Sequence, residues 1–494
     1  MLFTTGAFLF LFLPATLLVF FVTARTFGRS AAAAWLALAS LFFYGYWLPV
    51  YTILLLASVA ANYGFGTLIL QHQAGRRRAW LMVAVTTNLA VLAYFKYANF
   101  LLSTANVLVG TKFPLLSIVL PLGISFFTFT QIAYLADVYA GKVQQRNPIH
   151  YLLFVTYFPH LIAGPVLHHS EMMPQFALAE NYRPKLENFV VGLAFLAIGL
   201  AKKILIADSV APVANDAFDN HLSLGIGIGH AWVGVLAYAF QIYFDFSGYS
   251  DMAVGLSLLV GVQLPYNFNS PYKARSIIDF WHRWHMTLSR FLRDYLYFPL
   301  GGNRKGRIRR HVNLLVTMLL GGLWHGAAWT FVIWGGLHGM FLVVNHGWRF
   351  LYKRHRFISR ALERPLTARL WDGLAVALTL ICVLIAWVFF RAKTFAAASA
   401  MLASLFSQPP GTRISPSDGS LVPWLVALGA VVLLLPNSQR MIDQQLRPRL
   451  AQLRSWARAH ELFAFLAGTE VVVIVLLALI AARRDSTEFI YFNF

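Results

Sequence analysis

Two histidines in apolar surroundings, His285 and His325, are the residues of this sequence best suited to proton transfer. His325 lies in the run from Val312 to Asn345, which contains no Asp, Glu, Lys or Arg. Burial disfavours a charged imidazolium, so the ring is expected to be neutral and able to accept a proton. The pattern makes His325 a candidate general base.

The residues around His325 also fit a purely structural role. If the run is helical, Gly321, Gly322 and Ala328 lie three or four positions away. Small side chains allow a second helix or a substrate chain to approach closely. A helix-packing motif with a histidine bonded across the interface therefore stays open, and His338 in WGGLHGM has the same two interpretations.

His285 depends on the segment from Phe280 to Phe298, which we treat as one amphipathic helix at the membrane surface. One face would carry Trp281, His285, Leu288, Leu292 and Tyr295. The other would carry Arg283, Arg290 and Asp294. His285 is then on the buried side, either as a core residue or as a functional one, and His282 is nearer the edge.

Asp245 and Asp251 flank Gly248 in YFDFSGYSD. Two roles are open for them: a carboxylate can hold a histidine in one tautomer, or it can cap a broken helix.

Other kinds of site are not indicated. The sequence has no G-x-S-x-G, P-loop or H-E-x-x-H motif. His168 and His169 are adjacent, so on a helix they point about 100° apart. We expect no metal ion and no permanently bound cofactor, and the residues do not indicate covalent storage of an acyl group on this chain.

Composition identifies the environment of these residues. Charged residues make up 12% of the chain, against about 25% in soluble domains. Apolar runs long enough to cross a bilayer recur along it. We therefore expect an all-α, polytopic membrane protein with roughly a dozen transmembrane helices plus re-entrant and interfacial helices. The expected spans include 228–244, 250–263, 312–329, 331–347 and 462–482, and the Pro- and Gly-broken stretch 151–167 is expected to be re-entrant or buried in protein.

The net charge of +21 does not indicate nucleic-acid binding, because the cations gather in short connecting segments. Such clusters are typical of cytoplasmic loops beside a lipid bilayer. We expect a single domain over 1–494, with the site within about 120–346 and further helices over about 373–494.

Four segments resemble the membrane-bound O-acyltransferase family, and in particular its bacterial alginate O-acetylation branch. They are PHLIAGPVLHHSEMMPQF (159–176), YFDFSGYSDMAVGL (243–256), FWHRWHMTLSRFLRDYLYFPLGGNR (280–304) and LLGGLWHGAAWTFVIWGGLHGM (319–340). The resemblance implies a helical bundle around a central tunnel in the bacterial inner membrane. His325 matches the family's catalytic histidine and His285 its second polar position, whereas His282 stands where relatives often carry arginine.

The resemblance also implies a mechanism. Acetyl-CoA would be the donor, with its phosphates at a basic face formed by Arg283, Arg290, Arg304, Lys305 and Arg307. His325 would deprotonate an acceptor hydroxyl, and His285, Asn267 or Asn269 would donate to the oxyanion. A periplasmic hydrolase-like partner would pass the acetyl group to an exported polysaccharide. Acyl transfer to teichoic acid, peptidoglycan or cellulose, and a non-enzymatic transport role, stay as alternatives.

Overall fold

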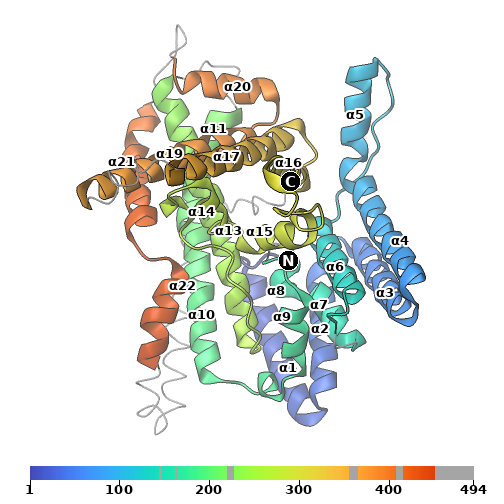
Figure 1. The fold of residues 1–494 in the computed structure, drawn as a ribbon. Coiled ribbons are helices and arrows are strands. Elements are labelled where there is room, and N and C mark those ends of the chain that lie inside the picture. The colour runs from blue at the N-terminus through green and yellow to red at the C-terminus, as the bar shows by residue number, and fades with distance from the viewer. Residues whose placement is uncertain (144–146, 163, 220–226, 355–364, 408–415, 451–494) are drawn as a thin grey trace. The chain divides into compact units, whose positions relative to one another are not determined.

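The computed structural model describes residues 1–143, 147–162, 164–219, 227–354, 365–407 and 416–450 (Figure 1). Helices and turns make up this part of the chain, and it contains no strand, which confirms the all-α class. The chain divides into two compact units. Unit 1 holds Met1–Ala201, Gly248–Tyr266 and the residues from Arg440, whereas unit 2 holds Lys202–Ser247 and Asn267–Gln439. The single domain expected from the sequence stays a prediction.

Five helices of the described residues are long and apolar enough to cross a membrane. They are Ala7–Thr26, Pro49–Gln71, Ala74–Val109, Leu186–Asp219 and Pro365–Arg391. A sixth span results if the pair Leu421–Leu434 and Ser438–Leu450, bent by 57°, counts as one. The chain is thus multi-pass, but this count does not confirm a dozen spans, and the span expected at 462–482 lies outside the described residues.

Unit 1 begins with helices joined by short turns, and further helices follow after longer segments. They are α1 (Leu13–Thr26), α2 (Arg29–Gly45), α3 (Pro49–Gln71), α4 (Ala74–Leu92), α5 (Ala98–Val109), α6 (Ile124–Tyr139) and α10 (Leu186–Ala201). Gly28, with a φ of 87°, permits the reversal between α1 and α2, which pack together (Figure 1). Inside the unit, the Asn62 amide on α3 donates to Asn88 on α4 at 3.1 Å, so each buried amide satisfies the other.

The segment expected to be re-entrant is indeed broken. Helix α7 (Pro148–Thr156) begins after Asn147, whose side chain accepts from two backbone N–H groups. It ends at Tyr157, and the short α8 (Phe158–Leu161) follows. Tyr157 is buried and its hydroxyl contacts the Ser257 hydroxyl at 3.1 Å. The backbone groups freed by this break therefore lie within protein, as a membrane environment requires.

One expected pair of spans is wrong. The runs 228–244 and 250–263 form a single helix, α13 (Ile228–Leu259), which continues through Gly248. Further along α13, Gly255 allows a close helix contact, because a Cβ there would collide with the carbonyl oxygen of Gly192 on α10. Gly248 and Gly255 are thus not helix breakers here, and Gly255 lets two helices of unit 1 touch.

Unit 2 carries the catalytic candidates. Its helices include α11 (Asp208–Asp219), α14 (Ile277–Trp281), α15 (Met286–Leu292), α16 (Gly306–His325), α17 (Trp329–Arg354), α19 (Pro365–Arg391), α20 (Phe395–Ser404) and α21 (Pro416–Leu434). Helices α16 and α17 pack side by side (Figure 1). The sequence predicts one span over 312–329 and the next from 331. The boundary between them lies earlier, because α16 ends at His325 and α17 begins at Trp329.

Candidate functional site

His325 is the last residue of α16 and is 4% exposed. Aromatic rings enclose its imidazole: the ring centroids of Trp324, Trp334 and Phe390 lie 4.9, 5.0 and 5.2 Å from its own. An imidazole enclosed in this way has little contact with bulk water. The structure therefore places the expected base in a dry aromatic chamber.

His285 lies in the same chamber, with its ring centroid 6.4 Å from that of His325. It is fully buried. Its φ of +43° is unusual for a residue other than glycine, because the left-handed region crowds Cβ. Such strain persists only where surrounding contacts hold it, and it is often found at functional sites. The two histidines that the sequence singled out are thus brought together.

Asn267 fixes the orientation of His285. Its Oδ1 accepts from His285 Nδ1 at 3.1 Å, from Thr287 Oγ1 at 2.9 Å and from the Thr287 backbone N–H at 3.3 Å. His285 therefore carries its proton on Nδ1 and a lone pair on Nε2. No described residue bonds Nε2. His285 lies outside the helices able to cross a membrane, and burial lowers the pKa of its imidazole to about 3, so it is neutral at pH 7.

His338, which is absent from the expected catalytic set, is a third imidazole of this cluster. It is fully buried on α17, and Trp281 Nε1 donates to its Nδ1 at 3.3 Å. An indole nitrogen can only donate, so Nδ1 must be the acceptor and the proton lies on Nε2. Trp334 connects the cluster, with its ring 4.8 Å from His338 and 5.0 Å from His325. Within the described residues, Nε2 of His338 and Nε1 of Trp334 have no hydrogen-bond partner.

The single helix expected from Phe280 to Phe298 is wrong. Helix α14 ends at Trp281, and α15 begins after His285. The carbonyl oxygen of Asn267 accepts from the Met286 N–H at 2.9 Å, so a distant backbone segment satisfies the interruption. Periodicity nevertheless assigned the faces well, since Trp281, His285, Leu288 and Leu292 are buried. The break turns His285 toward His325 instead of leaving it on a helix face.

Gly322, three residues before His325, packs against α17. A Cβ on Gly322 would collide with the carbonyl oxygen of Phe331, and a Cβ on Gly335 with that of Met318. The thin surface near His325 is thus filled by a neighbouring helix. The helix-packing interpretation therefore applies to Gly322, and the chemical role of His325 stays a prediction.

Asp245 does not cap a helix end, because it lies well inside α13. Its carboxylate pairs with Lys203 at 2.8 Å, and Lys203 also pairs with Asp208 at 2.8 Å. Lys203, which is 3% exposed, was missed by sequence reasoning because a charge beside an apolar run resembles an interfacial residue. Asp251 is also buried within α13, in the part of that helix that belongs to unit 1.

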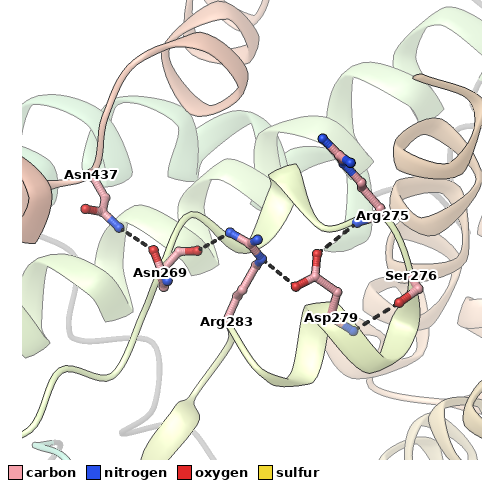
Figure 2. Close-up of polar contacts among 6 residues, drawn as sticks. All are labelled: Asn269, Arg275, Ser276, Asp279, Arg283 and Asn437. Carbon is pink, nitrogen blue, oxygen red and sulfur yellow. Dashed lines mark hydrogen bonds and ion pairs between the residues drawn. The ribbon is translucent and has the colours of Figure 1, made fainter. Parts of the chain in front are cut away.

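Two of the expected support and donor-binding residues, Arg283 and Asn269, form a polar chain (Figure 2). Arg283 donates to Asp279 at 2.7 Å and to the carbonyl oxygen of Asn269 at 3.3 Å. The Asn269 side chain accepts from Asn437 at 3.0 Å. Asn269 thus bonds to Arg283 and Asn437 and not to an imidazole, whereas the side chain of Asn267 contacts His285 directly.

Three cations of the expected basic face are separated from His325 by the length of a helix. Arg304, Lys305 and Arg307 are exposed around the start of α16, and Arg307 stacks on the Phe350 ring at 4.4 Å. The 20 residues of α16 span about 30 Å from there to His325. Arg290 is half-buried on α15. The exposed turn can attract phosphates but does not touch the chamber.

Comparison with known protein families identifies the family of this chain. Residues 79–387 match the model of MBOAT, the membrane-bound O-acyltransferase family, and this range includes every histidine of the chamber. The chain is a member of the membrane-bound O-acyltransferase family. It is accordingly an O-acyltransferase and a multi-pass membrane protein.

Curated relatives cover most of this O-acyltransferase. It is similar to the peptidoglycan O-acetyltransferase of Helicobacter pylori, with 43% identity over an alignment of 430 residues. This alignment covers 81% of this chain and 79% of the relative. It is similar to the probable alginate O-acetylase AlgI of Pseudomonas putida, with 41% identity over 82% of this chain and 80% of the relative. A teichoic acid D-alanyltransferase of Bacillus subtilis is 26% identical over 56% of this chain and 69% of its own length.

Proposed function

We propose that this O-acyltransferase takes acetyl from cytoplasmic acetyl-CoA and passes it across the bacterial inner membrane for O-acetylation of an exported glycan. The observation that carries the proposal is the pair of buried imidazoles, His285 and His325, 6.4 Å apart in one aromatic chamber. The relatives named as O-acetylases support acetyl as the acyl group, because their identity and coverage exceed those of the D-alanyltransferases. Alginate and peptidoglycan are the two polymers that these names suggest.

In the proposed reaction, His325 removes the proton from the acceptor hydroxyl as its oxygen attacks the thioester carbonyl. The carbon–sulfur bond then breaks, and the imidazolium returns the proton to the departing CoA thiolate. His285, with its lone pair on Nε2, can accept a hydrogen bond from the acceptor and orient it. It cannot donate to an oxyanion in this tautomer, because its one proton is held by Asn267.

The oxyanion needs donors, and the chamber offers two. The N–H groups of Trp334 Nε1 and His338 Nε2 are buried without acceptors among the described residues. A buried donor without a partner costs free energy, which a substrate oxygen would recover. We assign oxyanion stabilisation to these two groups in place of Asn269.

The final acceptor is reached through a second protein in our proposal. A periplasmic hydrolase-like partner receives acetyl from this chain and transfers it to the glycan. The exposed basic turn at Arg304, Lys305 and Arg307 attracts the donor's phosphates on the cytoplasmic side.

The test is acetyl-CoA thioester cleavage by purified protein in nanodiscs, with and without candidate periplasmic partners. His325→Ala is expected to lower turnover by about 10²–10⁴-fold, the usual contribution of a general base. His72→Gln is a matched control, because His72 belongs to unit 1, where its ring bonds the Leu68 carbonyl and contacts the Trp80 ring. Equal turnover in wild type and His325→Ala would exclude the general-base role. Turnover in neither, with every partner tried, would favour a transport component.

A further inference from the structure

Unit 2 contains a cavity that the proposed chemistry does not use. Its volume is about 730 Å³, within the range of ligand sites, and it lies between α14, α17 and α19. None of the three chamber imidazoles lines it. We call it the α17–α19 cavity.

One end of the α17–α19 cavity is polar and basic. Arg349 lines it and forms no ion pair with an acidic side chain of the described residues. The lining Arg275, in contrast, is neutralised by Asp372 at 2.9 Å. This end therefore has positive charge available for an anion.

The lining carboxylate does not cancel that charge. Asp279 accepts from Arg283 at 2.7 Å and from the backbone N–H of Arg275 at 3.1 Å, as Figure 2 shows. Its negative charge is thus already balanced within the polar chain. The charge facing the cavity is net positive.

The rest of the cavity is apolar and has the depth of one membrane leaflet. Phe341, Leu374 and Leu378 line it, and α19 is one of the helices able to cross a membrane. From Trp371 to Cys382, α19 rises by about 16 Å, against about 15 Å for half the hydrocarbon core. Trp371 stacks on Trp348 with ring centroids 5.6 Å apart, beside Arg349. Indoles at the charged end of an apolar slot are typical of the headgroup level.

We propose that the α17–α19 cavity binds a phospholipid with an anionic headgroup. The phosphate contacts Arg349, and an acyl chain lies along Phe341, Leu374 and Leu378. A soluble phosphate compound such as acetyl-CoA shares the anion, but its pantetheine arm carries amide groups that would be left without partners in the apolar part. The proposal does not depend on the proposed function.

The test uses Cys382, the only cysteine of the chain, which lines the apolar part of this cavity. The full chain is placed in nanodiscs of phosphatidylcholine with or without phosphatidylglycerol, and the rate of thiol alkylation by a small maleimide is measured. Phosphatidylglycerol is expected to slow alkylation of the wild type. Arg349→Gln is expected to weaken this protection by about fivefold, the effect of one cation near an anionic lipid surface.

Arg293→Gln is the matched control, because Arg293 is exposed, pairs with Asp294 and does not line the cavity. It should keep full protection. Native mass spectrometry of the same samples counts bound phosphatidylglycerol. This second measurement decides the result if the Cys382 thiol reacts slowly in every sample. Equal lipid retention in wild type and Arg349→Gln would overturn the proposal. Protection of Cys382 by acetyl-CoA in pure phosphatidylcholine would instead assign the cavity to the soluble donor.

Discussion

Trp281 donates to Nδ1 of His338 and thereby decides which nitrogen of that imidazole carries the proton. Trp281→Phe keeps an aromatic ring but removes this donor, so His338 becomes free to move its proton from Nε2 to Nδ1. We expect turnover to fall by about 10- to 100-fold with little change in KM, as for other partners that orient a functional histidine. Steady-state kinetics of acetyl-CoA cleavage measure this. An unchanged turnover would remove His338 from the reaction.

Asn267→Asp is expected to change the pH profile. A carboxylate beside Nδ1 stabilises the imidazolium and raises the pKa of His285, which burial holds low in the wild type. Activity that needs the neutral ring is present above this pKa and lost as pH falls through it. The acidic limb of the variant should therefore lie at higher pH than that of the wild type. Coincident pH profiles for kcat would contradict a role for neutral His285.

Gly335→Ala should destabilise the crossing of α16 and α17. The new Cβ would collide with the carbonyl oxygen of Met318, and backbone cannot move aside cheaply. We expect a loss of about 1–3 kcal/mol in the free energy of unfolding, typical of overpacking. Gly347→Ala, on the same helix with open space around it, should be neutral or slightly stabilising. Thermal unfolding in detergent compares the two, and equal midpoints would refute the tight crossing.

Lys203→Met should be more damaging than Lys202→Met. The first change leaves the carboxylates of Asp208 and Asp245 buried together without their cation. Breaking a buried ion pair costs about 3–5 kcal/mol, whereas the half-buried Lys202 has less to lose. Protein that does fold should keep normal turnover, because the cluster does not touch an imidazole. A selective loss of turnover at full stability would instead give Asp245 a role in the reaction.

Replacing Arg304, Lys305 and Arg307 by Gln together should raise KM for acetyl-CoA and leave kcat almost unchanged. These cations lie about 30 Å from His325 along α16, so they can act on donor recruitment only. The wild-type KM should rise with salt, and that of the variant should rise less. A fall in kcat alone would place the donor's phosphates closer to the chamber.

Much of the fold follows from local pattern. Uncharged apolar runs identify the long spans, because exposing backbone polar groups to lipid is so costly that helices are required there. Gly248 shows where pattern is insufficient. The sequence predicts a break between two spans there, but α13 continues through Gly248. No local sequence feature indicates this continuity.

The site was predictable in its parts but not in its connections. Polar residues within apolar runs indicated His285 and His325. The left-handed backbone at His285 depends on Asn267, and the tautomer of His338 depends on Trp281. Both contacts join segments that are distant in sequence. Periodicity describes one helix at a time and therefore could not find them. His338 carried a visible signal in WGGLHGM, but its partner did not.

The close approach at Gly322 and Gly335 has a consequence for motion. Helices that meet backbone to backbone cannot slide past one another without a collision, so α16 and α17 should move as one rigid hairpin with slow amide exchange. His325, at the end of this hairpin, is then stationary on the timescale of turnover. Entry and exit of substrates must depend on displacement of the surrounding segments, and the interrupted stretch between α14 and α15 is the one whose backbone is already bent for it.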